Sequence, residues 1–225
     1  MIDNHAHLDL MKDSLENVIS RAKNAGVAEF IVPGICGFPK KLDELIKYNE
    51  IKFCWGIYPK YAEIENIFEK ELEKLNNSFV KIIAVGECGL DKRFGNIEKQ
   101  IQLFQKQINL AINLDLPLII HLVGHWQKAF DLLKKSKIKS GFVLHSWSGS
   151  IEMAKEFVKL GGTISLSAGA LKSQEKLARI FKEIPNDKII FETDCPDQKP
   201  DFISAEENEP ANLPIIIEKI LSYKV

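Results

Sequence analysis

The sequence is poor in cysteine and contains no long hydrophobic run. Its four cysteines lie far apart, without a C-x-x-C pair or the dense spacing of small disulfide-bonded secreted domains. We therefore expect reduced thiols and a cytoplasmic protein. No stretch approaches the roughly eighteen consecutive apolar residues of a membrane-spanning helix, and Met1–His5 carries neither a basic segment nor an apolar signal core. We expect neither membrane insertion nor export.

An excess of charge of either sign is also missing. Thirty basic side chains are balanced by thirty-one acidic ones, which gives a net charge of −1. A chain this close to neutral has no general electrostatic attraction for nucleic acid or for an anionic membrane. Any contact with a polyanion must therefore come from a local group of cationic side chains.

The composition is ordinary for a globular protein, with 45% hydrophobic and 27% charged residues. No linker, low-complexity tract or block of charge divides the chain. Its 225 residues also exceed the roughly 200 that a closed α/β barrel requires. We therefore expect one domain over residues 1–225.

Short apolar runs rich in β-branched residues alternate with longer amphipathic segments, a pattern typical of parallel strands joined by helices. There are eight runs, the number of strands that closes a TIM-type barrel. The predicted strands are Met1–His5, Glu29–Pro33, Lys52–Ile57, Lys81–Glu87, Leu116–His121, Gly141–His145, Gly162–Ser167 and Lys188–Thr193. Helices are predicted at Ile64–Leu75, Ile97–Leu114 and Asn212–Leu221. The one long irregular stretch, Cys195–Asn208, follows the eighth strand.

The same alternation is compatible with an open, doubly wound sheet, but the placement of the histidines favours the barrel. Four of the five histidines stand at the end of a predicted strand or just beyond it, namely His5, His7, His121 and His145. Glu87 closes the fourth predicted strand, and Asp194 follows the eighth. In a barrel all parallel strands end on one face, which brings these six residues to one mouth. The sequence therefore predicts a (β/α)8 barrel.

These residue types bind catalytic metal ions. Imidazole and carboxylate hold Zn²⁺ or Mn²⁺ while leaving room for water, and a carboxylate can bridge two cations. Alternate residues of an extended segment project to one side, so His5 and His7 can face the same ion. The predicted assignment places one ion on His5, His7 and Asp194, a second on His121 and His145, and Glu87 as the bridge.

Taken singly, each histidine is better explained as a core residue satisfied by hydrogen bonds, and one His-x-His pair is weak evidence. Four histidines and two carboxylates that all stand at strand ends are harder to attribute to chance. The sequence therefore predicts a site for two divalent cations, with Zn²⁺, Mg²⁺ and Mn²⁺ all compatible.

At these positions the sequence resembles the TatD family of metal-dependent deoxyribonucleases, within the wider amidohydrolase-like barrels. Six collinear stretches that span nearly the whole chain carry the resemblance, namely Asp3–Asp9, Val85–Asp91, Gln107–Ala111, Leu116–His121, His145–Ser150 and Glu192–Pro196. The family's two-cation site maps onto the six positions chosen above. The resemblance implies deoxyribonuclease activity, commonly exonucleolytic, supported by Mg²⁺, Mn²⁺ or Zn²⁺.

Three departures from the family pattern concern the substrate. Relatives usually carry Gly-x-His-Pro-His after the third strand, whereas Gly56–Lys60 reads Gly-Ile-Tyr-Pro-Lys, so both histidines are replaced. Val123 stands where a basic residue is usual, and Asp197 replaces a usual tyrosine, as in one branch of the family. In relatives these positions look like phosphate or leaving-group contacts, so the resemblance supports the metal site more firmly than nuclease activity.

Four side chains are candidate substrate contacts: Tyr58, Lys60, Arg93 and His125. Lys60, Arg93 and the adjacent Lys92 can bind phosphate oxygens, although Lys92 and Arg93 fit ordinary solvated charges equally well. Tyr58 either donates its hydroxyl group to the substrate or fills the space of the missing histidine. His125 stands at a helix start, which slightly favours a structural role, and Trp147 favours packing over stacking on a base.

The favoured hypothesis is hydrolysis of DNA phosphodiester bonds by a metal-activated water, with Asp194 and Glu87 as catalytic residues and Asp194 as general base. A strand end or short single strand suits a near-neutral protein better than a long duplex. Two alternatives stay open. The first is hydrolysis of a small ester or amide, because the same metal pair activates water towards carbon. The second is non-catalytic binding on an inherited barrel, which the retention of six metal positions opposes.

Overall fold

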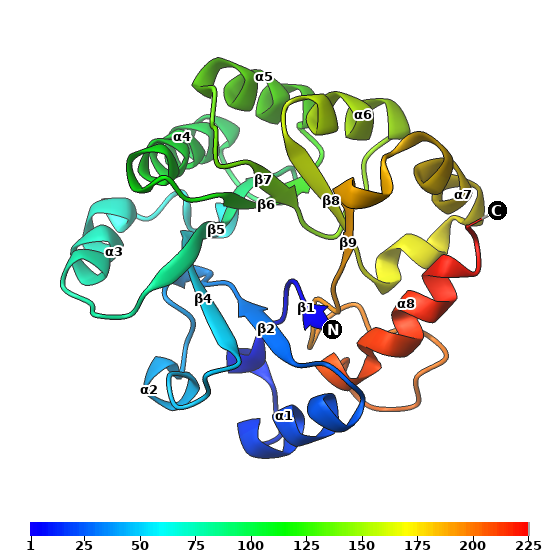
Figure 1. Ribbon diagram of the computed structural model, residues 1–225. Coiled ribbons are helices and arrows are strands. Elements are labelled where there is room, and N and C mark those ends of the chain that lie inside the picture. Colours follow the sequence, from blue (N-terminus) through cyan, green and yellow to red (C-terminus); the bar gives the residue numbers. More distant parts are fainter. Residues whose placement is uncertain (225) are drawn as a thin grey trace.

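Eight parallel strands form a barrel that helices surround (Figure 1). The computed structural model describes residues 1–224. In order around the barrel, the strands are β1 (Ile2–Asp3), β2 (Glu29–Val32), β4 (Ile51–Ile57), β5 (Ile82–Asp91), β6 (Leu118–Val123), β7 (Phe142–Leu144), β8 (Gly162–Leu166) and β9 (Ile189–Phe191). A short strand, β3 (Cys36–Gly37), pairs antiparallel with β4. The predicted TIM-type barrel is confirmed.

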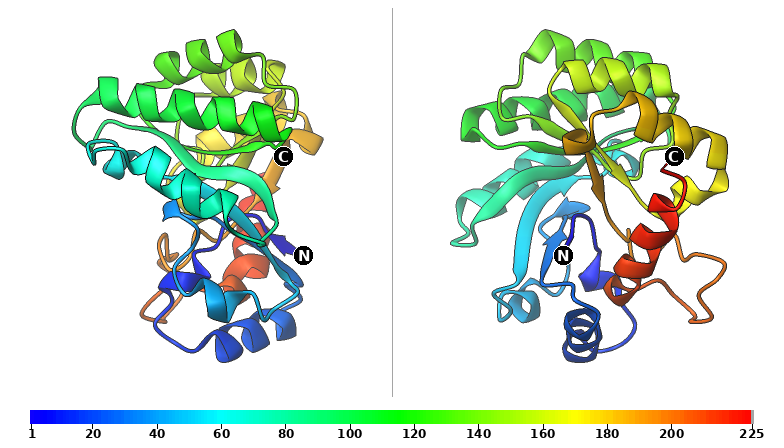
Figure 2. Two further views of the ribbon diagram at one scale, coloured as in Figure 1. Left: turned by 90° about the vertical axis from the view of Figure 1, so that its left-hand side faces the viewer. Right: turned by 45° about the vertical axis from the view of Figure 1, so that its right-hand side comes forward.

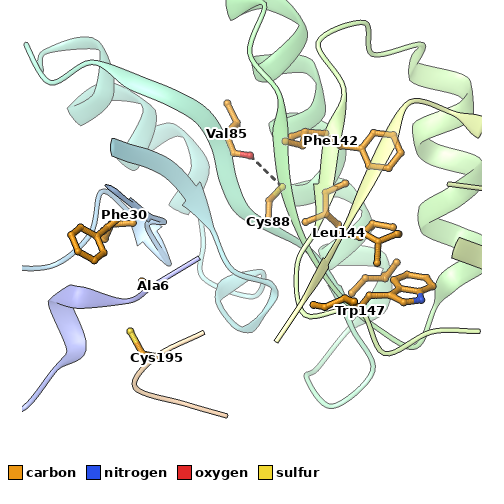
Figure 3. Packing of buried hydrophobic residues seen from close by; sticks show 14 of the residues in the cluster. Ala6, Phe30, Val85, Cys88, Phe142, Leu144, Trp147 and Cys195 are labelled. Carbon is orange, nitrogen blue, oxygen red and sulfur yellow. Dashed lines mark hydrogen bonds between the residues drawn. The ribbon is translucent and has the colours of Figure 1, made fainter. Parts of the chain in front are cut away.

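The barrel closes where the segment after β1 meets the segment after β9. Ala6 and Cys195 form a parallel bridge there, and both are labelled in the close view of Figure 3. The backbone N–H of His7 donates to the carbonyl of Cys195 at 2.8 Å, and that of Asp194 donates to the carbonyl of His5 at 2.9 Å. Closure of the barrel therefore places Asp194 beside both N-terminal histidines.

The helices form an outer ring around the strands, as two further views show (Figure 2). They are α1 (Leu15–Asn24), α2 (Leu42–Leu45), α3 (Ile67–Asn76), α4 (Ile97–Leu114), α5 (Trp126–Ser136), α6 (Ile151–Lys159), α7 (Gln174–Glu183) and α8 (Leu213–Leu221). Short 3₁₀ turns are η1 (Leu8–Leu10), η2 (Pro59–Tyr61), η3 (Ala168–Lys172), η4 (Asn186–Lys188) and η5 (Pro210–Asn212). Within residues 1–224, no helix is both long and apolar enough to cross a membrane.

Helix α4 has the bounds that the sequence predicts, whereas α3 begins at Ile67 instead of Ile64. Phe104, Ile108 and Ala111 are fully buried, and each large apolar side chain stabilises the fold by roughly 1.5–3 kcal/mol when buried. The Asn96 side chain begins the helix by accepting the backbone N–H groups of its first turn. Figure 3 shows another part of the core, in which Phe142, Leu144 and Trp147 pack together.

Strand β5 is longer than the sequence predicts, because it continues four residues past Glu87 to Asp91. The pairing of β5 with β6 shifts between Val85 and Cys88, which marks a β-bulge or other irregularity at Gly86–Glu87. A Cβ atom on Gly86 would lie 2.5 Å from the carbonyl oxygen of Ile119, so this close approach requires glycine. Bulges redirect side chains near functional sites. The expectation that Glu87 closes its strand is therefore wrong, although Glu87 does reach the site.

Candidate metal centre

The segment after β1 supplies the first two histidines of the site. Nε2 of His5 lies 3.2 Å from Nε2 of His7, and both rings are buried. Oδ1 of Asp194, which follows β9, lies 3.7 Å from Nε2 of His5 and 3.9 Å from Nε2 of His7. The three residues form a compact group of potential metal-binding atoms.

The carboxylate of Glu87 stands between this group and a second pair of histidines. Oε2 of Glu87 lies 3.4 Å from Nε2 of His7 and 3.6 Å from Nε2 of His5. Its other oxygen, Oε1, lies 2.9 Å from Nδ1 of His121 and 3.0 Å from Nε2 of His145. The structure therefore brings together all six residues that the sequence selects. His5, His7 and Asp194 form one compact group, His5 also groups with Glu87 and His145, and His121 contacts Glu87 and His145.

The electrostatics of this buried cluster favour a bound cation. Burial alone would raise the pKa of Glu87, but the adjacent His145 and His121 lower that pKa well below its ordinary value. Burial alone would lower the pKa of His145, yet the charge of Glu87 and a hydrogen bond with Glu192 raise it well above 6.5. Among the four histidines of the cluster, only His5 has a lowered pKa, because it is buried and lies beside His145. The carboxylate and imidazole lone pairs that converge here therefore attract positive charge, which a bound cation can supply.

The spacing of the donor atoms fits divalent metal ions. Donors bound to one ion at about 2.1 Å lie roughly 3.0–3.4 Å apart in octahedral or tetrahedral geometry. Nδ1 of His121, Nε2 of His145 and Oε1 of Glu87 are separated by 2.9, 3.0 and 3.0 Å. The group around His5, His7 and Asp194 is slightly wider and also includes Oε2 of Glu87. Imidazole and carboxylate donors suit Zn²⁺ and Mn²⁺.

A cavity of about 790 Å³ opens over the cluster, and its lining includes five of the six residues, namely His7, Glu87, His121, His145 and Asp194. Tyr58, Lys60 and Arg93 also line it, as do Val123 and Asp197. Within residues 1–224, the lining does not include His125, which directly precedes α5. Three of the four candidate substrate contacts therefore face the same space as the cluster.

Trp147 lines the cavity too, but most of its side chain packs against the protein. It is 4% exposed, and its ring lies edge-on to Trp126 and to Phe157 at centroid distances of 5.1 and 5.8 Å. The expectation that Trp147 packs instead of offering a free stacking surface is confirmed.

Comparison over the whole chain shows which known proteins this one resembles. The family described as TatD related DNase matches residues 2–225. The chain belongs to this family. It is 31% identical to YabD, an uncharacterized metal-dependent hydrolase of Bacillus subtilis, over 100% of this chain and 91% of that protein. The crystal structure of YjjV, a TatD homologue from Escherichia coli K12, matches with a TM-score of 0.87 at 27% identity, covering 100% of this chain and 90% of that one.

A further relative carries a more specific name. The 3'-5' ssDNA/RNA exonuclease TatD of Erwinia tasmaniensis is 28% identical over 91% of this chain and 84% of that protein. Together with the family match, the relatives identify this chain as a TatD-family metal-dependent hydrolase.

Two buried carboxylates in this TatD family member hold the histidines from outside the cluster, and the sequence did not reveal their role. Oδ2 of Asp91 lies 2.9 Å from Nε2 of His121. Oε1 of Glu192 lies 3.3 Å from Nδ1 of His145 and accepts the backbone N–H of Ser146 at 2.6 Å. A signal was present, because both are acidic residues in buried strands or strand ends within stretches that carry the TatD resemblance.

A polar network fixes Asp194, and its central residue, Gln198, also escaped prediction. The side-chain amide of Gln198 donates to Oδ2 of Asp194 and to Oγ of Ser146. Its oxygen accepts a hydrogen bond from Oγ of Ser167 at 2.7 Å. Gln198 lies in the irregular stretch after β9, so only its position in that loop pointed towards the site.

Proposed function

We propose that this chain is a phosphodiesterase that uses two divalent metal ions to trim single-stranded nucleic acid from its ends. The observation that best supports this proposal is that the two oxygens of the Glu87 carboxylate face different histidines. A carboxylate in this position can be shared by two ions about 3.5–4 Å apart, as in other two-metal hydrolases.

The proposed ligands follow the distances between the donor atoms. His5, His7 and Asp194 would hold one ion, His121 and His145 the other, and Glu87 both. When bound, such a pair lowers the pKa of an attacking water to about 7 and stabilises charge on the phosphoryl oxygens. The ion type stays open among Zn²⁺, Mg²⁺ and Mn²⁺.

Asp194 is the proposed general base. As the water oxygen bonds to phosphorus, Asp194 accepts the water's proton, the bond from phosphorus to the leaving strand breaks, and the leaving oxygen takes up a proton from solvent. The amide of Gln198 holds the carboxylate of Asp194 in place. Tyr58 is the proposed hydrogen-bond donor to the leaving oxygen, because it lines the cavity with its hydroxyl group 3.0 Å from Nε2 of His121. Burial and the charge of Glu87 raise the pKa of this hydroxyl group, so it keeps its own proton.

Cationic side chains around the cavity support a polyanionic substrate. Lys60, Lys172 and Lys176 line the cavity, while the lysine ion pairs within residues 1–224 involve other lysines. Burial lowers the pKa of Lys176, so a phosphate there would compensate part of the lost solvation. Relatives named as ssDNA/RNA exonucleases support the same substrate class. The local charge matters because the whole chain is close to neutral.

The alternative substrate is a small ester or amide. Apolar side chains occupy much of the cavity wall, including Leu122, Val123, Leu177 and Ile180. Together with the replacement of the two usual family histidines at Tyr58 and Lys60, this wall would also suit a compact apolar substrate.

End-labelled single-stranded DNA and RNA test the proposal. Oligonucleotides labelled at the 5′ or 3′ end are incubated with Mg²⁺, Mn²⁺ or Zn²⁺, or with chelator, using wild type, Glu87→Ala and the exposed-surface control Lys182→Gln. We expect stepwise, metal-dependent trimming by wild type and Lys182→Gln, and none by Glu87→Ala. Turnover of small esters or amides without any cleavage of nucleic acid would instead establish the alternative.

A further inference from the structure

Asp91 lies outside the ring of potential metal-binding atoms but touches one of its histidines. It is the last residue of β5, four positions after Glu87, and its side chain is fully buried. Its Oδ2 atom lies 2.9 Å from Nε2 of His121. The opposite ring nitrogen, Nδ1, faces Oε1 of Glu87 at 2.9 Å. The imidazole of His121 is therefore held between two carboxylates, and the hydroxyl group of Tyr58 also lies 3.0 Å from its Nε2 atom.

With a cation on the Glu87 side of the ring, this arrangement suits one tautomer of His121. A neutral imidazole carries a single N–H, and its other nitrogen is the one that can bind a metal. A cation shared by Nδ1 and Oε1 of Glu87 would leave Nε2 as the nitrogen that carries the proton, and the carboxylate of Asp91 is placed to accept it. Carboxylates in this position fix the orientation of metal-binding histidines in general.

Asp91 is itself fixed by Arg93. Nε of Arg93 donates to Oδ1 and Oδ2 of Asp91 at 2.9 and 3.0 Å, and Nη2 donates to Oδ2 at 2.5 Å. The backbone N–H of Arg93 also donates to Oδ1 at 2.8 Å. On the other side, Gln100 exchanges two hydrogen bonds with the backbone of Asp91, at 2.8 and 3.0 Å. The Nε and Nη2 groups of Arg93 are thus occupied within the protein.

We propose that Asp91 is a positioning residue that sets the tautomer of His121 for metal binding, and that Arg93 holds Asp91 instead of gripping a substrate phosphate. The proposal rests on the two-cation site of the proposed function but not on its substrate. Asp91 should affect only one of the two ions, because it contacts His121, whereas His5, His7 and Asp194 form the other side of the cluster.

Metal titration by calorimetry tests the proposal in wild type, Asp91→Asn, Asp91→Ala and Arg93→Gln, with the exposed Asp187→Asn as control. We expect two Mn²⁺ or Zn²⁺ sites in wild type. One of them should weaken about 10–100-fold in both Asp91 variants and less in Arg93→Gln, while the other keeps its affinity. The retained site also shows that a variant is folded. Asp187→Asn should match wild type.

Histidine ¹⁵N spectra of the metal-free proteins, recorded at a pH where His121 is neutral, supply a second readout, independent of activity. His121 should carry its proton on Nε2 in wild type and lose this preference in Asp91→Ala. Unchanged affinities and an unchanged tautomer in the Asp91 variants would overturn the proposal, as would a wild type that binds fewer than two ions. A wild type that binds two ions, responds to Asp91 substitution and cleaves no nucleic acid would support it and reject only the proposed substrate.

Discussion

Oε1 of Glu87 lies 2.9 Å from Nδ1 of His121, and Oε2 of the same carboxylate lies 3.4 Å from Nε2 of a different histidine, His7. One buried side chain therefore connects two groups of donors that come from distant parts of the chain. A substitution at Glu87 should affect both proposed ions, whereas one at His121 should affect a single ion.

Substitution of Glu87 by glutamine should weaken both metal sites together. The amide is nearly isosteric but lacks the negative charge and has only one acceptor oxygen. We expect hydrolysis to fall roughly 10³-fold or more, as for other residues on which a whole catalytic unit depends. Metal titration of Glu87→Gln and of His121→Gln makes the comparison. Two tight sites in Glu87→Gln would contradict the bridge.

Substitution of Asp194 by asparagine should abolish turnover while the fold stays intact. Asparagine keeps a side-chain oxygen in nearly the same position, but it cannot accept the proton of the attacking water. Circular dichroism melting should give a transition close to that of wild type, and the labelled-DNA assay should show no trimming. Wild-type rates in Asp194→Asn would remove Asp194 from the role of general base.

The site residues that could be predicted from the sequence are those at the ends of predicted strands. Four histidines stood where apolar runs stop, so the barrel topology alone was enough to bring them together. The irregular pairing at Gly86–Glu87 leaves no trace in the apolar pattern, so that pattern did not predict the continuation of β5 to Asp91. The role of Asp91 depends on which strand pairs with which, since His121 lies thirty positions away. Periodicity carries no information about such contacts.

Acid should release the metal ions. In the metal-free protein, burial alone would lower the pKa values of His7 and His145, but the adjacent Glu87 raises both above 6.5. Protonation of these two histidines therefore stabilises the metal-free fold fully below pH 6.5, and this contribution is lost as the pH rises through the raised values. Metal binding requires neutral imidazole, so its contribution has the opposite trend.

The increase in Tm on adding Mn²⁺ should consequently grow between about pH 6 and about pH 8. Thermal unfolding at a fixed Mn²⁺ concentration, compared with chelator at each pH, measures this increase. Groups far from the cluster contribute equally to both curves and cancel in the difference. An increase that stays constant or shrinks with rising pH would be inconsistent with metal binding by these histidines.

Removal of the hydroxyl group of Tyr58 should slow the reaction without disturbing the packing of its ring. The ring lies edge-on to Phe94 and His121 at centroid distances of 5.7 and 4.6 Å, contacts that phenylalanine can retain. A lost hydrogen bond to a charged leaving oxygen corresponds to a fall in kcat/KM of about 10-fold or more. Steady-state kinetics of Tyr58→Phe provide the measurement. An unchanged kcat/KM would mean that Tyr58 only fills space.

Lys176 should contribute one phosphate contact. For a single-stranded substrate, loss of one such contact reduces the slope of log affinity against log salt concentration by about 0.7. We expect this reduction in Lys176→Gln but not in Lys182→Gln, an exposed lysine further along α7. Oligonucleotide binding to the Glu87→Ala background, measured over a range of salt concentrations, gives both slopes. Equal slopes in Lys176→Gln and Lys182→Gln would show that Lys176 makes no phosphate contact.

The most direct test of the two-cation site is anomalous diffraction from crystals grown with Mn²⁺. We expect two anomalous peaks about 3.5–4 Å apart, one beside His5, His7 and Asp194 and the other beside His121 and His145, with the Glu87 carboxylate between them. A single peak, or peaks away from Glu87, would contradict the two-metal site on which the proposed hydrolysis depends.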